Sequence, residues 1–173
     1  MQRKSLATAI CLGALCTLSF IATAVAVPNR PAAARHLTAH DSWFQSLEPL
    51  PNGGWKYFTS AGSAGHDVVV FVSTHDVLVQ GTLVTAWFRW EYETAQLNGY
   101  TAYKSAAERV EIDCTSDAMR DLATTYYSRN NFEGASASQM TPATIAEWSP
   151  SVPGTIGEQM VNWGCAQTRA RHH

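Results

Sequence analysis

The chain has 173 residues, of which 46% are apolar and 15% are charged. This length suits one domain, and this composition excludes a disordered chain. The formal net charge of −2 disfavours nonspecific binding to nucleic acid or to anionic membranes, which requires clustered Lys and Arg.

Residues 1–26 are predicted to form a secretory signal peptide. The basic residues Arg3 and Lys4 precede an uncharged apolar run, and Ala24-Val25-Ala26 provides a cleavage site before Val27. The alternative is an uncleaved anchor, because a run of about 22 residues is long enough to span a bilayer. Cleavage would leave 10 basic and 14 acidic groups, and no membrane attachment is expected afterwards. We therefore expect export to the periplasm, the cell surface or the medium.

After cleavage two cysteines are left, Cys114 and Cys165. An oxidising compartment favours a disulfide between them. Closing a loop of about fifty residues would stabilise the fold by roughly 4 kcal/mol. Two buried free thiols or a metal-binding pair are the alternatives, although the sequence has no Cys-x-x-Cys motif to support zinc.

The mature sequence divides into a spacer, a domain and a tail. Residues 27–54 are rich in Pro and Ala, which predicts a flexible spacer with one short helix near residues 41–47. Alternating apolar and polar residues then predict strands at 55–58, 67–72, 77–79, 82–93, 102–114 and 119–127. Asn98-Gly99 predicts a turn between the two long strands, and residues 130–138 are expected to form an exposed loop.

The C-terminal segment has a helical pattern. Thr155 and Glu158 form a predicted capping box after Pro153, and Met160 and Trp163 lie on one apolar face of the predicted helix. The predicted fold class is therefore α+β: a single antiparallel sheet of about six strands with a C-terminal helix packed on it and one disulfide. The domain is expected to span residues 55–168, with fraying after Ala166 and a tail at 169–173.

Several of these segments together resemble the bacterial surface-adhesin protein E family. The resemblance extends from Trp55 to Cys165, and its most specific part is the run from Trp148 to Glu158, Trp-Ser-Pro-Ser-Val-Pro-Gly-Thr-Ile-Gly-Glu. The other matching segments are Asp67–Val72, Trp87, Val110–Cys114 and Tyr126-Tyr127.

The resemblance implies an antiparallel sheet with a disulfide-linked C-terminal helix, in a protein exported by a Gram-negative bacterium. It also implies adhesion to host matrix or serum glycoproteins such as laminin and vitronectin. Two features depart from this pattern: no lipid-attachment cysteine is found, and only Lys56 and Lys104 follow the leader as lysines.

The candidate catalytic and metal-binding groups are scattered. His66-Asp67 and His75-Asp76 lie near Ser63 and Ser73, but neighbours on a strand point to opposite faces, so solvated turn residues are expected. His36 and His40 have the spacing of a helical metal pair, and an exposed linker pair is the preferred interpretation. We expect no enzymatic activity and no cofactor.

Trp87, Arg89, Tyr126 and Tyr127 form the predicted partner-binding set, because Trp, Tyr and Arg are enriched at interface hot spots. Trp87 and Trp90 are expected on opposite faces of one strand, so a helix would cover one face, and loops, the spacer or a second subunit in a homodimer the other. The predicted function is a non-enzymatic adhesin-like module that binds host proteins. The alternative is a periplasmic structural or small-ligand-binding protein.

Overall fold

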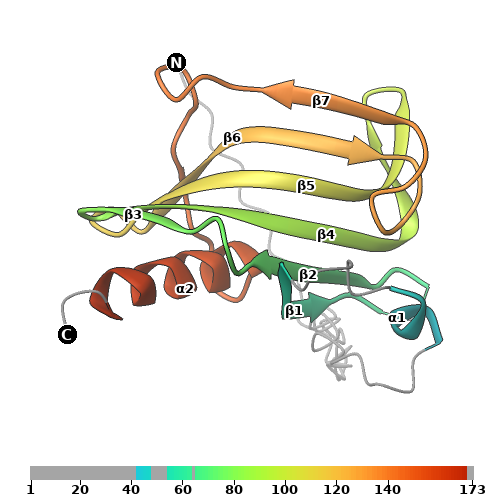
Figure 1. Cartoon of the computed structure of the whole chain (residues 1–173), viewed down its shortest axis with the longest axis horizontal. Coiled ribbons are helices and arrows are strands. Elements are labelled where there is room, and N and C mark those ends of the chain that lie inside the picture. Colours follow the sequence, from blue (N-terminus) through green and yellow to red (C-terminus); the bar gives the residue numbers. More distant parts are fainter. Residues whose placement is uncertain (1–41, 48–53, 64, 171–173) are drawn as a thin grey trace, which may run out of the picture. The chain divides into compact units, whose positions relative to one another are not determined.

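The computed structural model describes residues 42–47, 54–63 and 65–170, which all belong to the larger of the two units into which the chain divides, Ala32–His173. This part of the chain contains two helices and eight strands, and Figure 1 labels both helices and strands β1 to β7. The elements are α1 (Ser42–Ser46), β1 (Trp55–Ala61), β2 (Val68–Ser73), β3 (Leu78–Gln80), β4 (Leu83–Asn98), β5 (Thr101–Asp113), β6 (Ala118–Tyr127), β7 (Ser136–Met140), β8 (Ser149–Pro150) and α2 (Ile156–Ala170).

All the strands belong to one sheet, in which every pairing is antiparallel. The order is β1-β2-β4-β5-β6-β7, with β3 paired to β4 and β8 paired to β6. The sheet, the C-terminal helix and the disulfide confirm the predicted fold class.

The main hydrophobic core lies between the sheet and α2, on the side that we call the helix face (Figure 1). Strand residues at alternate positions supply it, since successive side chains point to opposite sides of a sheet. Helix α2 contributes Met160, Val161 and Cys165. The fully buried strand residues of this core are Val70, Val84, Ala86, Phe88, Val110 and Ile112.

Helix α2 begins where the sequence predicts it. The Thr155 hydroxyl accepts a hydrogen bond from the Glu158 amide at 3.2 Å, and the Glu158 carboxylate accepts one from the Gly154 amide at 2.7 Å. Gly164 allows close approach to the sheet, because a Cβ there would lie 2.7 Å from Cδ1 of Ile112. At the next residue, Cys165 forms the disulfide with Cys114, with the two Cα atoms 5.4 Å apart.

Three local expectations differ from the structure. Helix α2 continues to Ala170 rather than fraying after Ala166. Residues 136–138, expected at the end of a loop, belong to the edge strand β7, because the backbone of this strand pairs with β6. Strand β4 extends to Asn98, and a bulge between Glu91 and Gln96 interrupts its pairing with β5.

Other predictions lie outside the described residues: the signal peptide at 1–26, most of the 27–54 spacer, and the histidine pair His36 and His40. The short helix predicted near residues 41–47 is confirmed by α1. The domain boundary at 168 and the tail beyond it stay predictions.

Candidate functional site

The side of the sheet opposite α2, which we call the outer face, contains a buried ion pair. Arg89 and Glu91 are two residues apart on β4, so their side chains point to the same side. Nε of Arg89 donates to Oε1 of Glu91 at 2.6 Å, and both side chains are completely buried. Arg89 was predicted to belong to a partner-binding set, whereas the structure buries it with Glu91 inside the protein.

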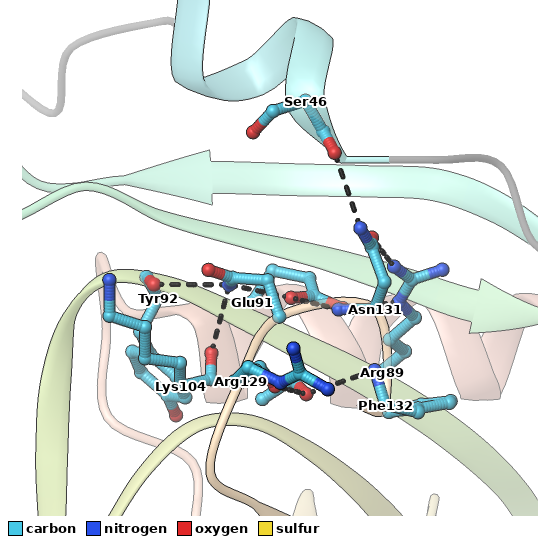
Figure 2. Close-up of polar contacts among 10 residues, drawn as sticks. Ser46, Arg89, Glu91, Tyr92, Lys104, Arg129, Asn131 and Phe132 are labelled. Atoms are coloured by element: carbon cyan, nitrogen blue, oxygen red, sulfur yellow. Dashed lines mark hydrogen bonds and ion pairs between the residues drawn. The ribbon is translucent and has the colours of Figure 1, made fainter. Parts of the chain in front are cut away.

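The loop between β6 and β7 covers this pair (Figure 2). The backbone N–H of Asn131 donates to both carboxylate oxygens of Glu91, at 3.1 and 3.2 Å. The side-chain oxygen of Asn131 accepts a hydrogen bond from Nη2 of Arg89 at 2.8 Å. Nδ2 of Asn130 donates to Glu91 at 2.7 Å and to the carbonyls of Tyr92 and Lys104. Because these bonds join residues far apart in sequence, they hold the loop against the sheet.

The backbone of this loop has an uncommon conformation. Asn131 and Phe132 both have φ of 61°, in the left-handed region that a bulky side chain such as Phe rarely adopts. The Ser105 hydroxyl accepts a hydrogen bond from the Phe132 backbone amide and donates one to the Arg129 carbonyl, which fixes this turn. Arg89 then lies between the rings of Phe71 and Phe132, 5.0 and 5.1 Å from their centroids, a cation–π arrangement.

Burial raises the pKa of Glu91, while Arg89 and the hydrogen bonds from Asn130 and Asn131 oppose that rise. Nδ2 of Asn131 also donates to the Ser46 carbonyl of α1 at 3.2 Å. Next to that contact, Leu47 packs with buried Val69. This half of the outer face is therefore covered by the chain itself, and its polar groups form hydrogen bonds within the protein.

The other half of the outer face is open. Trp87 of β4 lies opposite Arg109 of β5 in the sheet register. Trp87 is half-buried and Arg109 is exposed. Arg109 lines two hollows, of about 350 and 430 Å³. We call this surface the Trp87–Arg109 groove; its walls are residues 75–78 on one side, and Leu122 with residues 140–143 on the other.

Exposed apolar side chains stand at both walls of the groove. Leu78 is 47% exposed and Met140 is 80% exposed. His75 and Asp76 add polar groups to the first wall. A surface of this composition, with Trp and Arg at its centre, matches the residue types of protein interfaces.

The four residues predicted as a partner-binding set do not lie together. Trp87 lines the groove, but Arg89 is buried beneath the β6–β7 loop. Tyr127 packs against Phe132, with ring centroids 4.9 Å apart, and Tyr126 points to the helix face. Their role in partner binding stays a prediction.

Sequence reasoning missed Arg109 as a candidate. Alternation placed it on the same face as Trp87, but which residues face each other depends on the strand register. The bulge in β4 sets that register, and no local sequence signal indicates its size.

The histidine–aspartate pairs differ in burial. His66, His75 and Asp76 are exposed, whereas Asp67, expected to be solvated, is buried. Within residues 42–47, 54–63 and 65–170 there is no group of three His, Cys, Asp or Glu side chains positioned to hold a metal ion. No helix in this part of the chain has the length and apolar character needed to cross a membrane.

Two solved structures of Haemophilus influenzae protein E are similar to this chain, each at 11% sequence identity. The first has a TM-score of 0.46, and the match covers 64% of this chain and 84% of the protein E chain. The second, crystal form II, has a TM-score of 0.49, and the match covers 78% of this chain and 98% of the protein E chain. No curated protein sequence matches significantly. The family profile described as surface-adhesin protein E matches residues 55–166, nearly two thirds of the chain. The chain therefore belongs to the surface-adhesin protein E family.

Proposed function

We propose that this protein is a non-enzymatic, surface-exposed adhesin that binds a host matrix or serum protein through the Trp87–Arg109 groove. Membership of the surface-adhesin protein E family supports an adhesive role. The observation that carries the choice of surface is the pairing of half-buried Trp87 with exposed Arg109, between walls that present the exposed apolar side chains of Leu78 and Met140.

The groove suits an extended segment of a partner. Trp87 offers a large flat ring, which binds a partner with little loss of side-chain entropy, and Arg109 offers five N–H donors for carboxylates or backbone carbonyls. Leu78 and Met140 would be partly desolvated when such a segment binds. The opposite half of the outer face is filled by α1 and the β6–β7 loop, so it offers less room for a partner.

The test is binding of the purified domain to immobilised laminin and vitronectin at physiological salt. Trp87→Ala and Arg109→Ala are each expected to weaken binding by at least about tenfold, as hot-spot residues do. Arg169→Ala, which removes an exposed Arg from α2, is the matched control and is expected to bind normally.

Two further measurements keep the result interpretable. Far-UV and near-UV circular dichroism establish that each variant is folded, and Met140→Ser tests the groove at a fully accessible rim position. Equal binding by the wild type and all three groove variants would exclude this surface, and absence of binding at micromolar concentrations would exclude these two partners.

The competing function is that of a periplasmic ligand-binding or structural protein. Location separates the two. Protease treatment of intact cells removes a surface adhesin, whereas osmotic shock releases a periplasmic protein. Removal by protease is the result that the proposed function requires.

A further inference from the structure

The helix face of the sheet also carries a cavity, next to the core packed under α2. Its floor is Ala106 of β5, which is 3% exposed. Ala106 pairs with Trp90 on one neighbouring strand and with Tyr126 on the other. A small residue between two large aromatic ones leaves a hollow of about 220 Å³ above it.

Aromatic rings form most of the wall of this hollow. Trp90 and Tyr92 stack, with centroids 6.3 Å apart and an interplanar angle of 8°. The ring of Tyr103 meets that of Tyr92 edge-on at 5.6 Å, and lies 4.7 Å from that of Tyr126. Four rings from three neighbouring strands therefore surround one small volume.

A carboxyl group completes the wall. Glu108 lies two residues from Ala106 on β5, and its Oε2 accepts a hydrogen bond from Nε1 of Trp90 at 2.7 Å. Asp121 of β6 lies beside Glu108 and shares a hydrogen bond with it. None of the described residues that line the cavity is basic, so neither carboxyl has a cationic partner in the cavity wall.

Burial, and then the neighbouring Asp121, raise the pKa of Glu108 to about 7. Burial also raises the pKa of Tyr92 and of Tyr103, with the Glu108 carboxylate among the further causes. A cation placed in the cavity would favour the ionised form of the Glu108 carboxyl.

We propose that this cavity, the aromatic cage of Trp90, Tyr92, Tyr103 and Tyr126 closed by Glu108, binds an alkylammonium group. The negative faces of aromatic rings attract an ammonium ion, and a carboxylate at one end supplies the counter-charge. The shared ligand chemistry is that of a quaternary ammonium metabolite or of a lysine side chain on another protein. This site goes beyond the proposed adhesive function, since the cage and the Trp87–Arg109 groove lie on opposite sides of the sheet.

The test uses the folded, disulfide-bonded protein and three probes: choline, Nα-acetyl-lysine amide, and the neutral choline isostere 3,3-dimethylbutan-1-ol. The readout is the NMR signal of the Trp90 indole N–H, which is assigned by its loss in Trp90→Phe. Choline or the lysine probe is expected to shift this signal saturably below about 20 mM, and the neutral isostere to bind at least about tenfold more weakly. Tighter binding of choline would point to a small-molecule ligand, and tighter binding of the lysine probe to a protein ligand; both support the ammonium site.

Variants separate the cage from a generic apolar hollow. Glu108→Gln keeps an oxygen acceptor for Trp90 but removes the charge, and Tyr126→Leu removes one ring; each is expected to weaken binding at least about fivefold. Glu147→Gln removes an exposed carboxylate that does not line the cavity, and is the matched control. The proposal is overturned if neither cationic probe shifts the Trp90 signal, if the neutral isostere binds equally well, or if Glu108→Gln binds choline as the wild type does. Trp87→Ala is expected to leave this readout unchanged, because Trp87 lines the groove and not the cage. Failure of the adhesive function and failure of the cage are therefore distinguishable.

Discussion

Replacing Arg89 with Met tests whether the buried ion pair holds the β6–β7 loop on the sheet. The substitution removes a charged hydrogen bond to Glu91, a hydrogen bond to Asn131 and contacts with two aromatic rings. It also leaves the Glu91 carboxylate buried without its cation. Since removing one partner of a buried pair costs about 3–5 kcal/mol, and Met restores part of the packing, we expect the free energy of unfolding to fall by about 4 kcal/mol.

Urea denaturation monitored by tryptophan fluorescence measures this change, with the disulfide intact. Arg120→Met is the matched control: Arg120 pairs with Glu111 where both side chains are partly exposed, and stacks 4.2 Å from the Trp148 ring centroid. It should lose at most about 1.5 kcal/mol. A double-mutant cycle with Glu91→Gln is expected to give a coupling energy of about 2 kcal/mol. The reasoning fails if Arg89→Met costs no more than Arg120→Met, or if the two substitutions in the cycle are additive.

Two further predictions concern the disulfide and the carboxyl pair. Reducing and alkylating Cys114 and Cys165 should lower the free energy of unfolding by about 4 kcal/mol, since the bond closes a loop with a sequence separation of 51 residues; an unchanged urea midpoint would contradict this. Raising the pH from about 5 to 7.5 should destabilise the wild type relative to Glu108→Gln, measured as the difference between their urea midpoints at each pH.

The elements that sequence predicted well are those whose signal is local. Alternation within the long strand placed Trp87 and Trp90 on opposite faces, as the structure confirms. The capping box of Thr155 and Glu158 located the start of α2, because a helix N-terminus is fixed by hydrogen bonds between residues close in sequence. Cys114 and Cys165 were predicted to pair and do.

Strand register could not be predicted, and the groove depends on it. Counting outward from the Asn98-Gly99 turn would pair Trp87 with Ile112, whereas the bulge in β4 shifts the register and brings Arg109 opposite Trp87. The size of a bulge is set by how the two strands pack against the rest of the fold, which no short window of sequence contains.

The burial of Arg89 and Glu91 was missed for a related reason. A strand with apolar residues on one side and charged residues on the other ordinarily faces water with its charged side. Here the groups that satisfy both charges come from Asn130 and Asn131, about forty residues later. The Asn-Asn pair was the available signal, since Asn tolerates left-handed conformations and donates from its side chain, but it does not indicate which strand the loop covers.

The direction in which pH changes the stability of the protein depends on whether the folded or the unfolded state binds the Glu108 proton more tightly. Its pKa is about 7 in the folded protein against 4.5 ordinarily, so between these values the native state binds a proton that the unfolded chain has released. Raising the pH through this window removes that proton and lowers the stability of the native state; Asp121, whose pKa is also raised by burial, acts in the same direction. The titratable groups facing Glu108 are Asp121, Tyr92 and Tyr103, and none of these carries a positive charge that would reverse the sign. Glu147→Gln should follow the wild type, and parallel curves for the wild type and Glu108→Gln would contradict the assignment of the proton to this carboxyl. Because a bound ammonium favours the ionised carboxylate, choline should restore stability most at the upper end of the same pH window.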